Sequence, residues 1–258
     1  MNILFFDVDG TLVDSKTHEI PDSTIESIKN AQKKGNLCMI STGRHLYKLF
    51  ELEKIDQINW DGYVLDNGSL IMDKNKNIIS KHFLEKKQVY KIIEKCKSEN
   101  MVCTLQLMNE IIAPLGYSKY LKSTYEFLNW KLEDDIRDYN NEEVIYAIIY
   151  NKMAYDFNQF HEIKNIALYP NNSDYADINY VNSSKANGIK ELLNHLSLSD
   201  AETFCFGDSH NDIEMFKYIK TSIAMGNACF ALKELASYIT TDVNNNGIKR
   251  ALEKYNLC

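Results

Sequence analysis

Short continuous apolar runs recur at both ends of the chain, and each run ends abruptly in polar residues. A run of this kind, without alternation, is typical of a strand that is buried on both faces of a parallel sheet. Segments with apolar residues at helical spacing separate the runs, as in the helix predicted from Pro21 to Gly35. The runs lie at Ile3–Phe6, Asn36–Ile40, Asp61–Leu65, Thr203–Phe206 and Thr221–Met225. The pattern therefore predicts strand–helix–strand crossovers and a parallel sheet of the α/β class.

The middle of the chain has a different pattern. A charged amphipathic helix is predicted at Lys86–Asn100 and another helix at Tyr155–Asn165. Strand-like runs accompany them at Met101–Leu107, Glu110–Leu115, Val144–Tyr150, Ile166–Tyr169 and Tyr175–Tyr180. Hairpins that alternate with helices indicate an α+β module. We therefore expect a core domain of residues 1–82 and 183–258, and an inserted domain of residues 83–182.

Three shorter segments are less regular. A helix is predicted to begin near His45, directly after a Ser-Thr-Gly-Arg stretch. The segments Ser69–Met72 and Asn77–Ser80 indicate a hairpin around a polar turn. The aromatic-rich segment Thr124–Trp130 matches neither periodicity, and we assign it no element.

Composition narrows the classes of function. A chain of 258 residues with 45% hydrophobic residues can bury a sizeable core. Its net charge of −7 argues against non-specific nucleic-acid binding, which requires a basic surface. An acidic protein can still bind a small anion, because the local charge of a site can differ from the net charge. The sequence therefore leaves small anionic ligands as candidates.

The cysteines and the hydropathy of the sequence indicate the cellular compartment in which the protein is expected. The six cysteines are scattered without a C-x-x-C pair, which favours a reduced, cytoplasmic protein. The sequence begins with a strand rather than a basic segment and an apolar segment, so no signal peptide is expected. No apolar run reaches membrane-spanning length, so we expect no membrane partner. The oligomeric state is left open.

Chemically active residues gather where the predicted parallel strands end. The carboxyl ends of parallel strands meet at one edge of the sheet, where α/β proteins place their ligands. Each residue taken alone has an ordinary structural explanation, as a helix cap, a turn former or a solvated lysine. Together they supply carboxylates for a hard cation, a hydroxyl, an amide and an ammonium, which indicates a Mg²⁺–phosphate site. The residues that follow the strands are Asp7, Asp9, Ser41, Thr42, Asp208, Asn211 and Asp212, and Lys185 lies at the start of a predicted helix.

Four motifs in this order resemble those of the haloacid dehalogenase-like phosphatase superfamily. They are D-x-D-G-T at Asp7–Thr11, S-T-G-R at Ser41–Arg44, Lys185, and G-D-x-x-N-D at Gly207–Asp212. Insertion of the α+β module between the second and third motifs is similar to the Cof-type subfamily, which carries a type IIB cap. The stretches Asp66–Ser69 and Ala224–Ala228 also resemble that subfamily. One departure is Ala186, where the family usually has glycine.

The resemblance implies a fold and a set of site residues. It implies a Rossmann-like three-layer α/β core with a parallel sheet and an inserted α+β cap. It also implies a Mg²⁺-dependent phosphatase in which Asp7 is the nucleophile that forms an aspartyl-phosphate and Asp9 is the general acid and base. The metal would be held by Asp7, the main-chain carbonyl of Asp9 and Asp208, with Asp212 supporting them. The phosphate would be bound by the Val8 and Gly43 amides, Thr42, Lys185 and Asn211.

Two alternatives to hydrolysis stay open. The same core is found in phosphotransferases and sugar phosphomutases, which transfer the phosphoryl group to another hydroxyl. A protein that binds a phosphorylated ligand without turnover is the second alternative, although Asp7, Asp9 and Lys185 are all retained.

The leaving group of the phosphate ester is also open, with sugar phosphates and phosphorylated cofactors as the expected classes. Aromatic residues of the inserted domain could stack on a sugar or a base, or could fill the hydrophobic core of that domain. These residues are Tyr117, Tyr120, Tyr125, Phe127 and Trp130.

Overall fold

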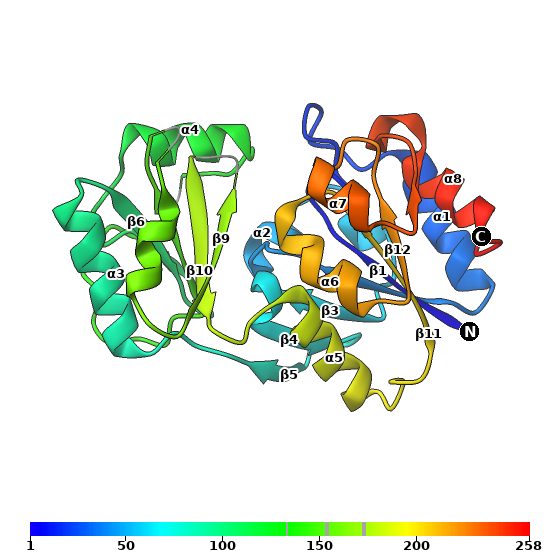
Figure 1. The fold of residues 1–258 in the computed structure, drawn as a ribbon, viewed down its shortest axis with the longest axis horizontal. Helices are drawn as coiled ribbons and strands as arrows, with labels where there is room; N and C mark the ends of the chain where they lie inside the picture. Colours follow the sequence, from blue (N-terminus) through cyan, green and yellow to red (C-terminus); the bar gives the residue numbers. More distant parts are fainter. Residues whose placement is uncertain (133, 153–154, 172–173) are drawn as a thin grey trace. The chain divides into compact units, whose positions relative to one another are not determined.

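The chain divides into two compact units (Figure 1). The computed structural model describes residues 1–132, 134–152, 155–171 and 174–258. The core unit consists of Met1–Ser80 and Ser184–Cys258, and the inserted unit consists of Lys81–Ser183. The core unit therefore combines residues from both ends of the chain.

The core unit is built on a sheet of eight strands in the order β13-β12-β11-β1-β2-β3-β4-β5. All pairings from β13 to β3 are parallel, and β3 pairs antiparallel with β4. In register, Phe5 of the central strand lies beside Cys205 on one side and Met39 on the other. The strands are β1 (Asn2–Phe6), β2 (Leu37–Ser41), β3 (Gly62–Leu65), β4 (Leu70–Asp73), β5 (Ile78–Lys81), β11 (Glu202–Gly207), β12 (Thr221–Ala224) and β13 (Tyr238–Ile239).

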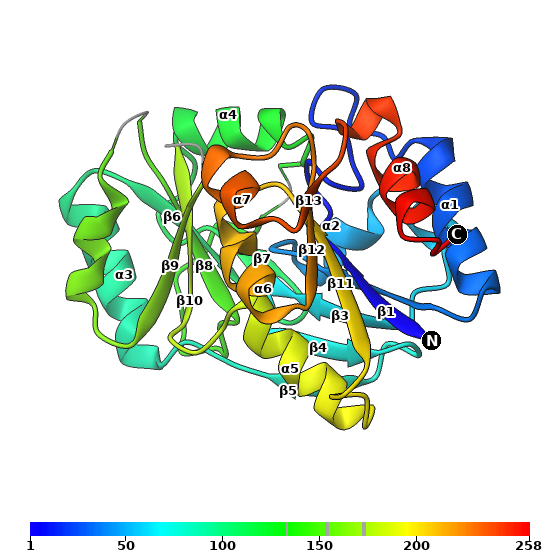
Figure 2. The ribbon, with the colours of Figure 1, turned by 45° about the vertical axis from the view of Figure 1, so that its right-hand side comes forward.

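Helices cover both faces of this sheet, which explains why its strands are continuous apolar runs. On one face α5 (Lys185–His195), α6 (Ile213–Tyr218) and α7 (Phe230–Leu235) share a buried cluster with β1, β2 and β11. On the other face α1 (Asp22–Lys33) and α8 (Gly247–Lys254) lie side by side (Figure 2). The core unit therefore has three layers, with the sheet in the middle.

One predicted helix of the core unit is short. The helix expected from near His45 is the single-turn α2 (Leu46–Phe50). The chain after it turns at Lys54, which adopts a left-handed conformation with φ +68°, and the short 3₁₀ helix Ile55–Gln57 follows. The predicted hairpin is present, with β4 and β5 as neighbours at the edge of the sheet.

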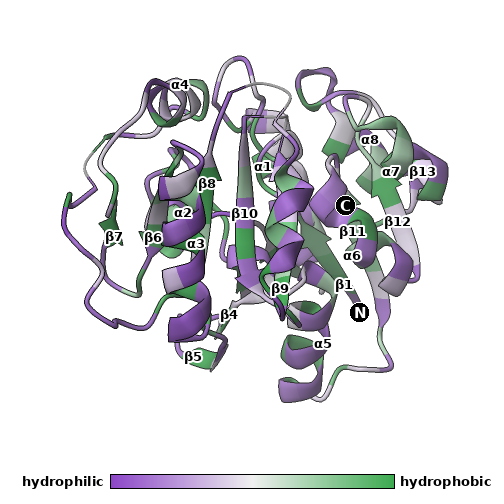
Figure 3. Ribbon diagram, turned by 60° about the vertical axis from the view of Figure 1, so that its left-hand side comes forward, coloured by the Kyte–Doolittle hydropathy of each residue, from purple (hydrophilic) through white to green (hydrophobic). Residues whose placement is uncertain are grey.

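The inserted unit has a five-stranded sheet in the order β7-β6-β8-β10-β9. Every pairing in it is antiparallel. Hydrophilic and hydrophobic residues alternate along β10, as Figure 3 shows. The strands are β6 (Val102–Gln106), β7 (Ile111–Ile112), β8 (Tyr146–Tyr150), β9 (Ile166–Asn171) and β10 (Tyr175–Tyr180).

Helices pack on both faces of this second sheet. The helix α3 (Lys86–Ser98) and the 3₁₀ helix Phe157–Glu162 pack on one face around residues such as Ile149. The helix α4 (Lys119–Phe127) packs on the other face, where Tyr125 lies with Tyr146 and Tyr150. The unit therefore has a core of its own on each side of the sheet.

Three expectations for the inserted unit need correction. The helix predicted at Tyr155–Asn165 is the 3₁₀ helix Phe157–Glu162, in which Phe157 and Phe160 are both buried one 3₁₀ turn apart. The strand predicted at Glu110–Leu115 is only Ile111–Ile112, because the chain turns at Gly116, where φ is +68°. The unassigned aromatic segment Thr124–Trp130 contains the second half of α4, which begins after the N-cap Ser118.

No helix within the described ranges combines the length and the apolar character that a membrane span requires.

Candidate active site

The sheet order of the core unit explains how distant acidic residues meet. Asp7 directly follows β1, Thr42 directly follows β2, and Asp208 directly follows β11. These three strands are parallel neighbours, with β1 in the middle. Their carboxyl ends therefore deliver the three side chains to one edge of the sheet.

Lys185 joins two carboxylates at this edge. Its Nζ lies 2.6 Å from Oδ1 of Asp7 and 2.6 Å from Oδ1 of Asp212. The side chains of Lys185 and Asp212 are both fully buried. Lys185 is placed by the start of α5, where the Ser184 hydroxyl accepts a hydrogen bond from the Asn187 amide. A buried ammonium is thus held between two acids that precede and follow it by many residues.

Asp7, Asp208 and Asp212 form an acidic cluster. One carboxylate oxygen from each lies within 4.8 Å of the others. Asp212 is held in place by further bonds, since its Oδ2 accepts from the Asp208 amide at 2.9 Å and from the Ser209 amide at 3.0 Å. The hydroxyl of Thr11 lies 3.4 Å from Oδ1 of Asp208. Asp212 is therefore committed to lysine and backbone partners, which suits a supporting role.

The acidic cluster carries more negative charge than Lys185 can balance. Burial raises the pKa of Asp7 to about 7, with Lys185 opposing the increase and Asp212 adding to it. Burial also raises the pKa of Asp208 well above its ordinary range, and the neighbouring carboxylates of Asp7 and Asp212 add to that increase. Burial lowers the pKa of Lys185, but the carboxylates of Asp212 and Asp7 outweigh it and hold the value above the ordinary one. The lysine is therefore charged.

These residues fit a hard divalent cation. Carboxylate and carbonyl oxygens are the ligands that Mg²⁺ prefers. A positive charge beside Asp7 and Asp208 would favour their ionised forms, which burial and then the neighbouring carboxylates disfavour. Asp9 is not among the three clustered carboxylates, so its predicted metal contact through the main-chain carbonyl stays a prediction.

The carboxylate of Asp9 instead forms a two-pronged ion pair with Arg44. Nε of Arg44 donates to Oδ2 at 2.7 Å, and Nη2 donates to Oδ1 at 2.7 Å. Sequence reasoning included Arg44 in a motif without giving it a role. The motif was the only available signal, because an arginine after a strand does not by itself reveal which acid it contacts.

Three of the predicted phosphate-binding residues lie around Asn67, which the sequence analysis placed only in the Asp66–Ser69 stretch of the family resemblance. Oδ1 of Asn67 accepts from Nδ2 of Asn211 at 3.0 Å. A Cβ atom on Gly43 would lie 3.0 Å from that same oxygen, so the Gly43 backbone passes directly against Asn67. The amide of Asn67 also donates to the Thr42 carbonyl at 3.0 Å. Asn67 follows β3. The expectation that ligand-binding residues come directly after parallel strands, which located the other residues, could therefore have located Asn67 as well.

The loop that carries the first motif, Asp7–Thr11, is also hydrogen-bonded to the segment that follows β12. Gly10 has φ +75°, and a Cβ atom there would lie 2.2 Å from Oδ2 of Asp208. The Gly10 carbonyl accepts a hydrogen bond of 2.7 Å from Nδ2 of Asn227. Asn227 lies in the Ala224–Ala228 stretch that carried part of the family resemblance, but it had been given no role.

The aromatic residues predicted for the inserted unit mostly serve its core. Tyr125 is buried, and its hydroxyl donates to Oδ2 of Asp134 at 2.7 Å. Tyr117, Tyr120 and Trp130 pack against the same buried cluster. Phe127 is exposed. The hydrophobic-core explanation therefore holds for Tyr117, Tyr120, Tyr125 and Trp130.

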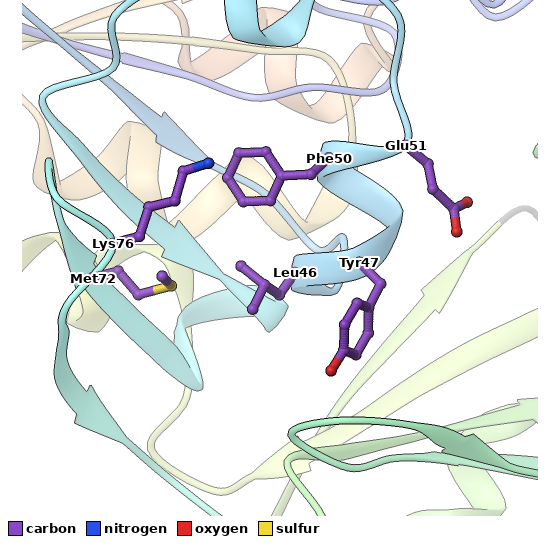
Figure 4. A pocket seen from close by; sticks show the side chains of 6 residues that line it. All are labelled: Leu46, Tyr47, Phe50, Glu51, Met72 and Lys76. Atoms are coloured by element: carbon purple, nitrogen blue, oxygen red, sulfur yellow. The ribbon is translucent and has the colours of Figure 1, made fainter.

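A separate hollow in the core unit lies beside α2 and β4 (Figure 4). It has a volume of about 500 Å³ and contains none of the clustered acids. Lys76 reaches across it, with Nζ 3.6 Å from the centre of the Phe50 ring. The lining residues are Leu46, Tyr47, Phe50, Glu51, Met72 and Lys76.

Comparison with known proteins places these features in a family. The profile of the haloacid dehalogenase-like hydrolases matches residues 4–252. The "5-amino-6-(5-phospho-D-ribitylamino)uracil phosphatase YcsE" of Bacillus subtilis is 27% identical, covering 99% of this chain and 96% of that protein. "Phosphoglycolate phosphatase 1" of Saccharolobus solfataricus is 24% identical, covering 98% of this chain and 95% of that protein.

A solved structure gives the same result for the fold. The structure of "the HAD Subclass IIB Sugar Phosphatase BT4131" superposes with a TM-score of 0.86 at 28% identity, over 100% of both chains. The predicted fold class, a parallel-sheet α/β core with an inserted α+β module, is therefore confirmed.

Proposed function

The chain belongs to the haloacid dehalogenase-like hydrolase family, whose phosphatases act on small phosphorylated substrates, and we propose that it is a Mg²⁺-dependent phosphatase that works through an aspartyl-phosphate on Asp7. The observation that supports this most directly is the buried Lys185 ammonium, which lies 2.6 Å from both Asp7 and Asp212 beside Asp208. A phosphoryl-transfer site needs positive charge next to a carboxylate nucleophile, and this arrangement supplies it.

Asp7 and Asp208, with the main-chain carbonyl of Asp9, would hold Mg²⁺. Asp212 would support them, because both of its oxygens are already engaged by Lys185 and by backbone amides. When bound, the ion supplies positive charge that allows an anionic carboxylate to approach an anionic phosphate.

The remaining predicted residues would bind the phosphoryl oxygens. Lys185 would offer charge, Thr42 a hydroxyl and Asn211 an amide group, together with the main-chain amides of Val8 and Gly43. One of these donors is held in place within the protein, since Nδ2 of Asn211 donates to Oδ1 of Asn67 at 3.0 Å. Donors that are already in position stabilise developing charge without reorganising.

The chain's own groups account for two half-reactions. In the first, an oxygen of Asp7 attacks phosphorus, the bond from phosphorus to the ester oxygen breaks, and Asp9 delivers a proton to the departing alkoxide. In the second, Asp9 removes a proton from water, the resulting hydroxide attacks the phosphorus of the aspartyl-phosphate, and inorganic phosphate leaves Asp7 as a free carboxylate. One water is consumed, and one alcohol and one phosphate are released.

We also propose that the core unit carries catalysis and that the inserted unit is a type IIB cap. The named relatives act on a sugar phosphate, a ribitylaminouracil phosphate and phosphoglycolate, so their leaving groups differ widely. The proposed substrate class is therefore small phosphorylated metabolites, including sugar phosphates and phosphorylated cofactors. The scattered spacing of the six cysteines supports a cytoplasmic location.

The test is release of inorganic phosphate from an aryl phosphate and from a panel of sugar phosphates and phosphorylated cofactors. The reaction is run with Mg²⁺, with EDTA, and with Asp7→Asn protein, and the matched control is Asp200→Asn at an exposed position of the core unit. We expect turnover that disappears with EDTA and in Asp7→Asn but persists in the control. Acid-quenched protein should carry one phosphoryl group on the peptide that contains Asp7.

Other outcomes would favour the alternatives. Phosphorylated sugar formed in the presence of sugar acceptors, without release of inorganic phosphate, would indicate a phosphotransferase or phosphomutase. Binding of phosphate esters by folded, Mg²⁺-loaded protein without turnover would indicate a binding protein.

A further inference from the structure

We propose that Arg44 is the positioning residue of Asp9, which it holds by a two-pronged ion pair so that this carboxylate serves the leaving group in a defined orientation. The proposal rests on the proposed function, in which Asp9 is the general acid and base. It begins from the two hydrogen bonds of 2.7 Å from Nε and Nη2 of Arg44 to the two oxygens of Asp9. A fork of this kind sets the plane of a carboxylate as well as its position.

Arg44 is the fixed partner of the pair. Its side chain is 5% exposed, whereas that of Asp9 is 44% exposed. The third guanidinium nitrogen, Nη1, donates to the Lys48 carbonyl in α2 at 2.8 Å. The guanidinium is therefore anchored to the backbone of a helix, and the more exposed carboxylate is aligned to it.

The backbone of Arg44 is fixed by Thr42, which is expected to bind phosphate, and by Asp66. Its amide donates to Oγ1 of Thr42 at 3.1 Å, and its carbonyl accepts from the Asp66 amide at 3.2 Å. The turn from Thr42 to Arg44 thus carries a proposed phosphate ligand at one end and the anchor of Asp9 at the other. A displacement of this turn would misplace both groups together.

The fork sets the direction from which Asp9 can act. Each of its oxygens accepts one bond from Arg44 and keeps a further lone pair that can contact a leaving-group oxygen. Lysine cannot reproduce the arrangement, because an ammonium is a point charge without a planar fork. If Arg44 acts through Asp9, its removal should matter most where the leaving group most needs a proton, and little where the leaving group departs easily.

The experiment measures kcat/KM for a series of aryl phosphates with graded phenol acidity and for one alkyl phosphate. This parameter reports steps up to formation of the aspartyl-phosphate, so later hydrolysis does not mask the leaving group. We expect Arg44→Gln to lose about 10–100-fold on the alkyl phosphate and less than about 3-fold on the most acidic phenol. Arg44→Lys should behave like Arg44→Gln. The matched control is Arg250→Gln, at an exposed position on α8, which should keep the wild-type dependence.

A double-mutant cycle with Asp9→Asn decides whether Arg44 acts through Asp9. We expect the double variant to lose no more than Asp9→Asn alone on the alkyl phosphate. Three results would each overturn the proposal. They are a double variant whose loss in kcat/KM is the product of the two single losses, an Arg44→Gln loss that is equal on all leaving groups, and wild-type kcat/KM in Arg44→Lys. Thermal melts identify a variant that fails to fold. If Arg44→Gln does not fold, the same measurements are made on Arg44→Lys, which keeps a charge beside Asp9.

Failure of the proposed function would look different. Wild-type turnover that survives Asp7→Asn would reject the aspartyl-phosphate mechanism itself, whatever the Arg44 variants do. A wild-type enzyme that depends on Asp7 and Asp9 but has Arg44 variants with an unchanged leaving-group dependence would reject only the role of Arg44.

Discussion

Nζ of Lys185 lies 2.6 Å from Oδ1 of Asp7, although the two residues are 178 positions apart in the chain. The contact joins the start of α5 to the end of the central strand β1. Because the lysine also contacts Asp212, one buried charge links three segments of the core unit. The residues of the proposed site are thus also part of what holds the core unit together.

Replacing this lysine should cost stability as well as activity. In Lys185→Gln the carboxylates of Asp7 and Asp212 would stay buried without a cation, and breaking a buried pair in this way costs about 3–5 kcal/mol. We expect a loss of that size in the free energy of unfolding by urea without Mg²⁺. The control is Lys220→Gln, whose exposed pair with Glu202 is worth at most about 1 kcal/mol. Equal losses in the two variants would contradict the expectation.

Mg²⁺ should stabilise the protein more at high pH than at low pH. The folded-state pKa of Asp7 is about 7, above its ordinary value of 3.8, so between these values the folded state binds more protons than the unfolded state. The contribution of Asp7 to stability without metal therefore falls as pH rises through this window. Mg²⁺ binds the ionised carboxylates and offsets the loss, so its increase in Tm should be larger near pH 8 than near pH 5.5. Melts with and without Mg²⁺ at both values test this, and a pH-independent increase would count against it.

Gly10, in the turn after β1, and Gly35, which follows α1, offer a matched pair of glycine substitutions. Gly10 and Gly35 have φ of +75° and +83°, so alanine at either position should cost about 1–2 kcal/mol in backbone strain. A Cβ at Gly35 meets nothing within 4 Å, whereas one at Gly10 would lie 2.2 Å from Oδ2 of Asp208. Gly35→Ala should keep its activity, and Gly10→Ala should lose about 10²-fold in kcat and require more Mg²⁺. Comparable activity in the two folded variants would show that Asp208 is not displaced.

Asn67 should affect phosphate binding without a large effect on folding. It adopts φ +51°, so Asn67→Gly removes the side chain while relieving the left-handed conformation. Loss of the hydrogen bond to Asn211, worth about 0.5–1.5 kcal/mol, should weaken inhibition by inorganic phosphate by about 2–10-fold. The control is Asn246→Gly, which makes the same change at an exposed residue with φ +59°. An unchanged inhibition constant in Asn67→Gly would show that Asn67 does not position Asn211.

Local pattern was sufficient for much of the fold. Strands buried on both faces must be apolar throughout, so β1, β2, β3 and β11 could be located from the sequence. Parallel strands end at one edge, so the residues after them could be grouped before any coordinates were known. Roles such as nucleophile and metal ligand came from the family resemblance of the motifs. The short 3₁₀ helix Phe157–Glu162 was mistaken for an α-helix, because apolar residues spaced three apart suit both.

The sequence by itself thus determined the order of the elements and the chemical groups at the sheet edge. Only the tertiary structure decided which groups touch: Arg44 with Asp9 across 35 positions, and Asn211 with Asn67 across 144. Secondary structure depends on periodicity among near neighbours, which a sequence displays directly. A side-chain contact depends on strand order, register and rotamer together, and those are set only when the whole core packs.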